Sequence, residues 1–352
     1  MEFLIEYGLF LAKSLTVLVS ILVVIVVIFG STQRQRDPEV GHIEVKNLND
    51  SLEGVTQSLK SIVLNPELLK KDAKEEKKKG KEKYKTQKKD LKQGEGPRPR
   101  MFVVDFVGDV QASEVVNLRE EITAILSVAE DQDEVLVRLE SPGGVVHGYG
   151  FAASQLQRIR NKSVPLTVAV DKVAASGGYM MACIANKIIA APFSLLGSIG
   201  VVAQIPNFHR ILKKNDIDVE ILTAGKYKRT LTLFGENTDK AREKFVDDLE
   251  DVHELFKDFV LDNRPQLDME KVATGEAWFG KRALERDLVD ELKTSDEYIV
   301  DSCANRDVFL VKYVIHKNKI DKIFERVTRL WMGSALSRQT MLQQTLPNQF
   351  IQ

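Results

Sequence analysis

A serine among small residues is the first candidate for chemistry in this sequence. Ser176 stands in the segment Ala174-Ala175-Ser176-Gly177-Gly178-Tyr179, directly before a helix expected over residues 178–185. Its hydroxyl could cap that helix, or it could act as a nucleophile beside the helix N-terminus. A nucleophilic serine needs a base, and no histidine follows at an obviously suitable place. The segment also departs from G-x-S-x-G, so a Ser-His-Asp triad lacks support.

A lysine is the alternative base. Lys228 lies in Gly225-Lys226-Tyr227-Lys228-Arg229, which follows a strand expected over residues 219–223. A free lysine side chain titrates near pH 10.4, so a lysine that acts as a base near pH 7–8 needs a depression of roughly 3 units, or about 4 kcal/mol. Burial in a water-poor cleft beside another cation supplies such a shift. From spacing alone, a solvated loop lysine remains the simpler interpretation.

A glycine-rich loop is the third candidate. Ser141-Pro142-Gly143-Gly144 ends a strand expected over residues 134–139 and precedes a helix expected over residues 146–160. Two glycines there let the backbone approach a ligand and direct N–H groups at it. Taken alone, the loop is equally an ordinary strand-to-helix turn.

The elements that position these loops alternate between strand and helix. Apolar runs predict strands over residues 101–107, 134–139 and 165–170, with helices over 113–129 and 146–160 between them. This order indicates βαβ units and a mostly parallel sheet, in which ligands bind at the carboxyl ends of strands. Further expected elements are short strands over residues 188–190, 199–204 and 219–223, and a long helix over residues 238–263.

Four motifs together resemble the signal peptide peptidase A family. They are Ser141-Pro142-Gly143-Gly144, Ala175-Ser176-Gly177-Gly178-Tyr179, Gly197-Ser198-Ile199-Gly200-Val201 and Gly225-Lys226-Tyr227-Lys228. Each motif alone is weak, but their order and spacing are specific, and the resemblance covers about residues 101–300. It implies an α/β Clp-protease/crotonase-like fold, a membrane-bound serine endopeptidase with a Ser-Lys dyad, ring- or dome-shaped homo-oligomers, and no metal or other cofactor.

The resemblance also implies a role for each matching residue. Ser176 would be the nucleophile and Lys228 the general base. The N–H groups of Gly143 or Gly144, with that of Gly177, would form the oxyanion hole, usually the largest electrostatic contribution to such a reaction. Ser198 would hydrogen-bond the lysine amine, although it is nearly as well explained as a turn residue.

One segment departs from the family. The family commonly ends its core with Gly-Leu-Val-Asp, where this chain has Asp287-Leu288-Val289-Asp290. An aspartate in place of glycine predicts a different helix ending, which concerns packing rather than the dyad.

The N-terminus predicts a membrane anchor over residues 1–33. Residues 14–33 carry no charge, and about 20 apolar residues cross a bilayer. Glu2 and Glu6, and the absence of an A-x-A site, argue against a cleaved signal peptide. The resemblance implies the bacterial inner membrane with a periplasmic catalytic domain, whereas Arg34 and Arg36 favour a cytoplasmic one.

The remaining segments differ sharply in charge. An amphipathic helical segment is expected over residues 34–69, a charged linker over 70–100, and the peptidase domain with a helical extension over 101–352. The chain has a net charge of −1, but residues 70–92 hold 12 lysines and 5 acidic residues. That linker is most simply a solvated spacer, with binding to anionic lipid as the alternative and nucleic acid disfavoured.

Composition limits the remaining functions. The 43% hydrophobic content supports a packed core, and two cysteines, Cys183 and Cys303, cannot build a disulfide framework or a four-ligand zinc site. The expected partners are therefore a peptide or unfolded protein, membrane lipid and further copies of the chain. Two rival functions stay open, a crotonase-type acyl-CoA enzyme and a non-catalytic membrane scaffold in which Ser176 only caps its helix.

Overall fold

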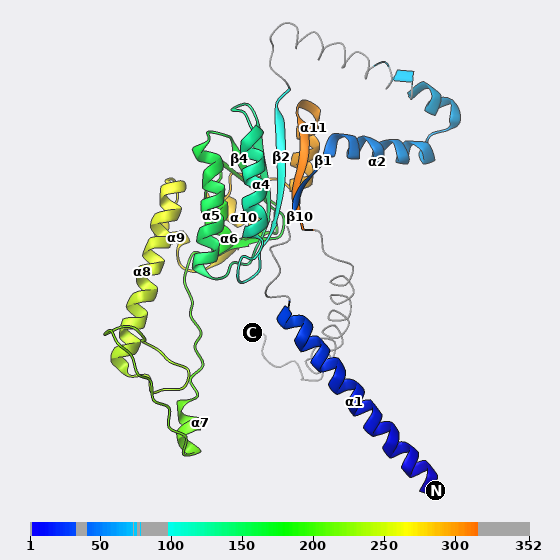
Figure 1. The fold of residues 1–352 in the computed structure, drawn as a ribbon. Coiled ribbons are helices and arrows are strands. Elements are labelled where there is room, and N and C mark those ends of the chain that lie inside the picture. The colour runs from blue at the N-terminus through cyan, green and yellow to red at the C-terminus, as the bar shows by residue number, and fades with distance from the viewer. Residues whose placement is uncertain (1, 33–40, 73, 76–77, 79–97, 316–352) are drawn as a thin grey trace, which may run out of the picture. The chain divides into compact units, whose positions relative to one another are not determined.

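The chain divides into two units in the computed structural model. The structure describes residues 2–32, 41–72, 74–75, 78 and 98–315, without the side chains of residues 2–4 and 22–32 (Figure 1). Ile43–Tyr313 forms one unit, and Met1–His42 with Val314–Gln352 forms the other. The expected charged linker beyond residue 78 and the C-terminal extension beyond residue 315 lie outside the described residues.

A seven-stranded sheet organises the larger unit. Its strand order is β1-β10-β2-β3-β4-β6-β9, and every pairing from β10 to β9 is parallel. The predicted parallel α/β sheet is therefore confirmed. The strands are β1 (His42–Asn47), β2 (Arg100–Val107), β3 (Glu134–Glu140), β4 (Leu166–Val170), β6 (Lys187–Ala190), β9 (Glu291–Leu292) and β10 (Asp307–Val314).

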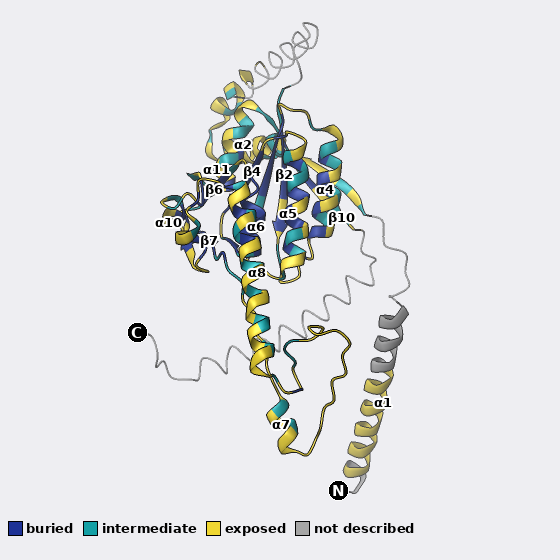
Figure 2. Cartoon of the chain, turned by 90° about the vertical axis from the view of Figure 1, so that its left-hand side faces the viewer, coloured by how far each residue is buried: buried dark blue, intermediate teal, exposed yellow. Residues whose placement is uncertain are grey.

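Helices bury both faces of this sheet. Alternate residues of β2 point to opposite faces, so Phe102, Val104 and Phe106 join the core beneath α4 (Val115–Val128) and α5 (Val146–Asn161). Their neighbours in β2 pack toward α11 (Ser295–Asn305) in a second cluster. Burial on both sides explains why these strands are continuous apolar runs, and Figure 2 shows them dark blue between their covering helices.

A smaller sheet leads directly into the candidate site. Its strands are β5 (Val173–Ala175), β7 (Leu195–Gly197) and β8 (Ala277–Phe279), with β5 parallel to β7 and β7 antiparallel to β8. The short helix α6 (Gly177–Ala182) begins two residues after β5 ends. Ser176 is thus the single residue between a strand and a fully buried helix.

A long excursion leaves the body after β7. Residues 201–237 contain one short helix, α7 (His209–Lys214), before α8 (Asp239–Asn263) returns to the body (Figure 1). The strands expected over residues 199–204 and 219–223 are wrong. Both runs are apolar, but no neighbouring strand satisfies their backbone groups, and Val202 and Leu222 are each 91% exposed. The remaining short helices are α9 (Met269–Val272) and α10 (Gly280–Leu284).

The N-terminal helix α1 extends over Glu2–Thr32. Within the part of the chain that is described, no helix has both the length and the hydropathy of a membrane span. The predicted anchor is therefore not supported there. Most of its apolar run, residues 22–33, lies outside the residues whose side chains are described.

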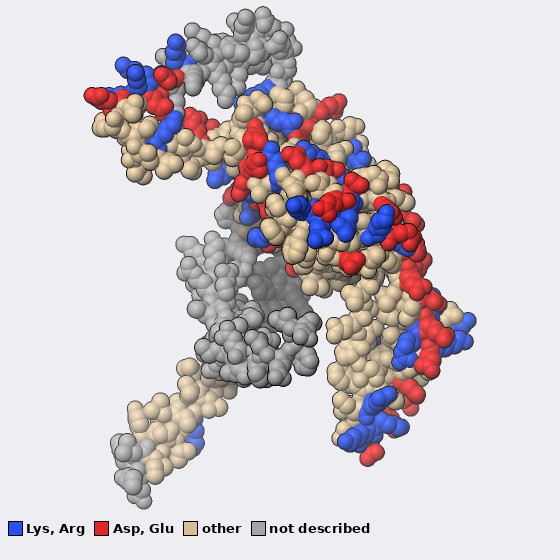
Figure 3. Space-filling model, turned by 180° about the vertical axis from the view of Figure 1, so that it is seen from behind, with Lys and Arg blue, Asp and Glu red and all other residues tan. Residues whose placement is uncertain are grey.

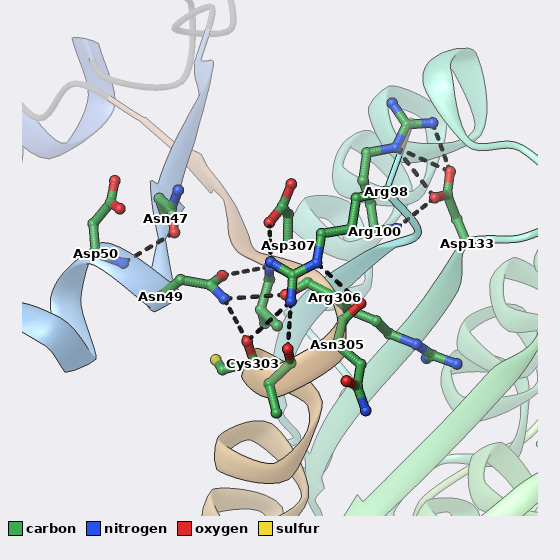
Figure 4. Close-up of polar contacts among 12 residues, drawn as sticks. Asn47, Asn49, Asp50, Arg98, Arg100, Asp133, Cys303, Asn305, Arg306 and Asp307 are labelled. Carbon is green, nitrogen blue, oxygen red and sulfur yellow. Dashed lines mark hydrogen bonds and ion pairs between the residues drawn. The ribbon is translucent and has the colours of Figure 1, made fainter. Parts of the chain in front are cut away.

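The segment expected to be helical over residues 34–69 contains a strand before its helix. Asn47 ends β1 and caps α2 (Leu48–Val63) by accepting a hydrogen bond from the Asp50 N–H group. Asn49 then ties this segment to the body: its Nδ2 donates to the Cys303 and Arg306 carbonyls, and its Oδ1 accepts from the Val308 N–H group (Figure 4). No residue of α2 is buried, so its apolar stripe faces outward.

Arg98 also binds the C-terminal end of α11. Its guanidinium group donates to the Ala304 carbonyl at 2.6 Å and to Asp307 at 2.9 Å (Figure 4). Both cysteines are free, with Cys183 buried and Cys303 half-buried. The two cysteines therefore form no disulfide bond with each other.

Candidate active site

Ser176 has a strained backbone. Its φ of 52° and ψ of −120° place a non-glycine residue in a sparsely populated region, and its side chain makes no cap hydrogen bond to α6. Its N–H donates to the Gly197 carbonyl at 2.8 Å, and its carbonyl accepts from the Met180 N–H at 3.0 Å. The interpretation of Ser176 as a simple N-cap is therefore wrong. Instead, Ser176 lines a cavity from the turn between β5 and α6.

Glycines surround this serine because neighbouring backbone and rings leave no room for side chains. A Cβ added to Gly177 would lie 2.4 Å from Cγ of Tyr149, and one added to Gly178 would lie 2.6 Å from the Ser141 carbonyl oxygen. Gly143, with a φ of +91°, would place a Cβ 2.7 Å from the Cβ of Ser176. The glycine loop and the turn at Ser176 therefore lie in direct contact.

Hydrogen bonding distinguishes the N–H groups of the glycine loop. The Gly143 N–H donates to the buried Ser141 Oγ at 3.1 Å. Within the described residues, the N–H groups of Gly144 and Gly177 have no hydrogen-bond partner, and both glycines line the cavity at Ser176. This pattern favours Gly144 over Gly143 as the loop's donor to a ligand.

The cavity at Ser176 has a volume of about 80 Å³ and mostly apolar walls. Helix α6 contributes Met180, and it packs between α5 and α8. The sequence alone did not identify the apolar walls, because the lining residues come from four separate segments. The available signal was the spacing of Val252 and Phe256, which lie four residues apart on α8 and so share one face of that helix. The lining residues are Gly144, Val146, Ser176, Gly177, Met180, Gly200, Val201, Val202, Val252 and Phe256.

Lys228 and Ser198 are not brought to this cavity within one copy of the chain. Lys228 is exposed in the loop after Gly225, to whose carbonyl it donates its N–H at 3.2 Å. Ser198 is half-buried at φ 52°, with its N–H donating to the Glu276 carbonyl at 2.6 Å. No described contact joins these two side chains to each other or to Ser176. The structure therefore assembles Ser176, Gly144 and Gly177, but not the expected base.

A histidine, His253, directly follows a residue that lines the cavity. His253 is adjacent to Val252, and its Nε2 is buried without a hydrogen-bond partner in the described part of the chain. Across the same residues, no cluster of three or more His, Cys, Asp or Glu side chains could hold a metal ion.

Comparisons with known proteins place the chain in a family. Residues 2–156 match the family model "Peptidase family S49 N-terminal", and residues 158–308 match "Peptidase family S49". "Probable protease SohB" of Haemophilus influenzae is 51% identical over 325 residues, covering 91% of this chain and 92% of the relative. A protein of the same name from Buchnera aphidicola is 49% identical, covering 85% and 99%. The chain therefore belongs to peptidase family S49.

Solved structures add a more distant likeness. A variant of the 1510-N membrane-bound stomatin-specific protease, in complex with a substrate peptide, aligns with 66% of this chain and 99% of its own at 14% identity, with a TM-score of 0.41.

Proposed function

We propose that this chain is a serine endopeptidase in which Ser176 attacks a peptide carbonyl and Lys228 is the general base. This proposal rests on one observation: Ser176 has a strained backbone and lines the cavity. A backbone held in such a conformation costs about 1–3 kcal/mol, and such strain gathers at active sites. The family membership gives the turn its chemistry, on a Clp-protease/crotonase-like fold.

The reaction has two stages. The Ser176 hydroxyl adds to the scissile carbonyl while the Lys228 amine takes its proton, and the resulting oxyanion accepts hydrogen bonds from the N–H groups of Gly144 and Gly177. The resulting Lys228 ammonium group then protonates the leaving nitrogen as the C–N bond breaks, and an acyl-enzyme remains. Water hydrolyses this acyl-enzyme with the same lysine as base. Ser198 orients the amine, and no metal or other cofactor takes part.

A second copy of the chain completes the site. In one copy the lysine lies on the exposed excursion, outside the cavity that holds the serine. This excursion also exposes large apolar side chains, which soluble proteins commonly bury in interfaces. Figure 3 shows mostly uncharged surface on the left of the region that this excursion forms with α8, and charged side chains on its right. The exposed apolar residues are Val202, Phe208, Ile211, Ile217, Val219, Ile221, Leu222, Leu233 and Phe234.

The substrate is an extended peptide or unfolded segment with an apolar residue beside the scissile bond. The cavity is small, and its side walls are Val146, Met180, Val201, Val252 and Phe256. Burial of an aliphatic side chain there supplies binding energy of about 1–3 kcal/mol. Membrane-derived segments and signal peptides carry such residues in abundance.

Filling the cavity tests this specificity. Val252→Phe is expected to lower kcat/KM by about 10-fold or more for peptides with leucine at the cleavage site, because the new ring occupies the space for that side chain. Peptides with glycine there should change little. Leu255→Phe is the matched control, since Leu255 is 62% exposed on the same helix and does not line the cavity. Equal rates for Val252→Phe and unchanged enzyme on leucine peptides would contradict this role.

Residues 14–33 anchor the enzyme in the inner membrane. The uncharged run of 20 residues in the sequence supports this, as does the continuity of α1 through Thr32. After extraction of membranes with alkaline carbonate, the full chain is expected in the pellet, whereas release into the supernatant would contradict an anchor. Activity of alkaline phosphatase fused after the catalytic domain would indicate the periplasmic side, and its absence the cytoplasmic side.

A further inference from the structure

Two buried hydroxyl groups lie directly beneath the glycine loop. Ser141 and Tyr149 have no exposed surface, and their hydroxyl oxygens are 2.5 Å apart. Ser141 begins the loop at the end of β3, and Tyr149 lies in the first turns of α5. The mechanism above uses neither side chain.

The hydrogen bonds of this pair run in one direction. The Tyr149 hydroxyl donates to the Asp109 carbonyl at 2.8 Å, so its single proton is committed there. The short bond between the two hydroxyls must therefore be donated by Ser141. The Ser141 oxygen keeps a lone pair for the Gly143 N–H at 3.1 Å. A continuous chain thus links the glycine loop to the Asp109 loop.

The same pair also contacts the nucleophile's segment. The Ser141 N–H donates to the Val173 carbonyl at 2.8 Å, and the Ser141 carbonyl accepts from the Ala175 N–H at 3.0 Å. These bonds fix the register between the glycine loop and β5, the strand that ends at Ala175, directly before Ser176. The ring of Tyr149 lies against Gly177, where an added Cβ would come within 2.4 Å of Cγ.

We infer that Ser141 and Tyr149 are positioning residues that set the orientation of the oxyanion donors, an inference that rests on the proposed function. Gly143 is held with its N–H toward Ser141, which leaves the next N–H, that of Gly144, directed at the cavity. Without the Ser141 acceptor, the Gly143 N–H would be buried and unpaired, and rotation of the peptide group would relieve this unfavourable state. Such a rotation would move the Gly144 donor away from the developing oxyanion.

Removal of the hydroxyl groups tests this inference. Tyr149→Phe and Ser141→Ala are each expected to lower kcat by about 10-fold or more, with KM changed by less than about twofold, because the lost interaction acts mainly in the transition state. The double variant should lose about as much as either single variant, since the hydroxyls act as one chain. Additive losses, or a rise in KM at unchanged kcat, would overturn the inference.

Tyr179→Phe is the matched control. Tyr179 is equally buried, and its hydroxyl donates to the Leu288 carbonyl at 3.0 Å, away from the glycine loop. This variant loses one buried hydrogen bond, whereas Tyr149→Phe loses two. Its melting temperature should therefore fall, by less than that of Tyr149→Phe, while kcat stays within about twofold of the unchanged enzyme. Equal loss of kcat in both variants would indicate a general effect of destabilisation and would overturn the inference.

Amide hydrogen exchange separates this inference from the proposed function, because it requires no turnover. In the unchanged full chain, the Gly143 amide should exchange slowly and the Gly144 amide rapidly. In Tyr149→Phe and Ser141→Ala, exchange at Gly143 should accelerate by about 10-fold or more, the equivalent of 1.4 kcal/mol. Equally fast exchange at both glycines in the unchanged chain would overturn the inference even if the enzyme hydrolyses peptides normally.

Discussion

Replacement of Ser176 with alanine is expected to lower the rate of casein hydrolysis by at least about 10³-fold. The alanine keeps the Cβ that packs against Gly143 but removes the hydroxyl oxygen proposed to form the acyl-enzyme. Alanine has the same Cβ and therefore the same backbone strain, so folding should stay intact and the melting temperature should change little. Turnover of a quenched fluorescent casein by detergent-solubilised full chain measures the effect.

Ser154→Ala is the control for Ser176→Ala. Ser154 is exposed on α5 and donates only to the Gly150 carbonyl of its own helix. Its loss should leave turnover within about twofold of the unchanged enzyme, because surface substitutions change stability by less than about 0.5 kcal/mol. Wild-type turnover in Ser176→Ala would refute the proposed nucleophile.

Lys228→Ala should cause a loss of similar size, at least about 10³-fold, because the serine hydroxyl then has no base. Lys226→Ala is the matched control, with a loss below about tenfold, since its amine lies over the Tyr227 ring, 4.9 Å from the centroid. If Lys228→Ala keeps full activity, the lysine is not the base. A loss in His253→Ala alone would then assign that role to the buried imidazole.

A mixture of the two inactive variants reveals which copy supplies the lysine. Ser176→Ala chains retain Lys228, and Lys228→Ala chains retain Ser176. Co-assembly should restore a substantial fraction of activity if the serine of one copy meets the lysine of the next. Continued inactivity after subunit exchange would contradict a site shared between copies, although each single variant would still support the dyad.

The central strands β2, β3, β4 and β6 could be predicted from the sequence because most of their residues are buried, on both faces of the sheet. Continuous runs such as β2 and β4 are unambiguous when flanking helices show a 3.6-residue period. The same logic failed for residues 199–204 and 219–223, which are equally apolar. Apolar composition alone does not show what a segment packs against. In the described residues, these two segments have no strand to pair with.

The site was only partly predictable for a similar reason. Motifs identified Ser176 and the glycine loop, but the choice between Gly143 and Gly144 depends on the buried Ser141 hydroxyl. That hydroxyl bonds Gly143 in its own loop and Tyr149 in α5. Tyr149 had no local signal, since its importance comes from contact with Gly177 across the fold.

Asp287 shows how a substitution can change composition without changing backbone geometry. It was expected to alter the helix ending, yet it adopts a φ of 59°, the left-handed conformation that glycine favours. The Arg264 guanidinium donates to the Asp287 carbonyl at 2.8 Å and also pairs with Asp290. These bonds from the buried Arg264 side chain hold the turn in place, and sequence patterns do not reveal them.

Capture of the acyl-enzyme tests the central claim most directly. Turnover of an activated peptide ester by the full chain would be stopped with acid, and the modified residue located by mass spectrometry of the digested protein. The acyl group is predicted on Ser176 and should be absent in Ser176→Ala. An acyl group on any other residue, or equal labelling of the alanine variant, would contradict the assignment of Ser176 as the nucleophile.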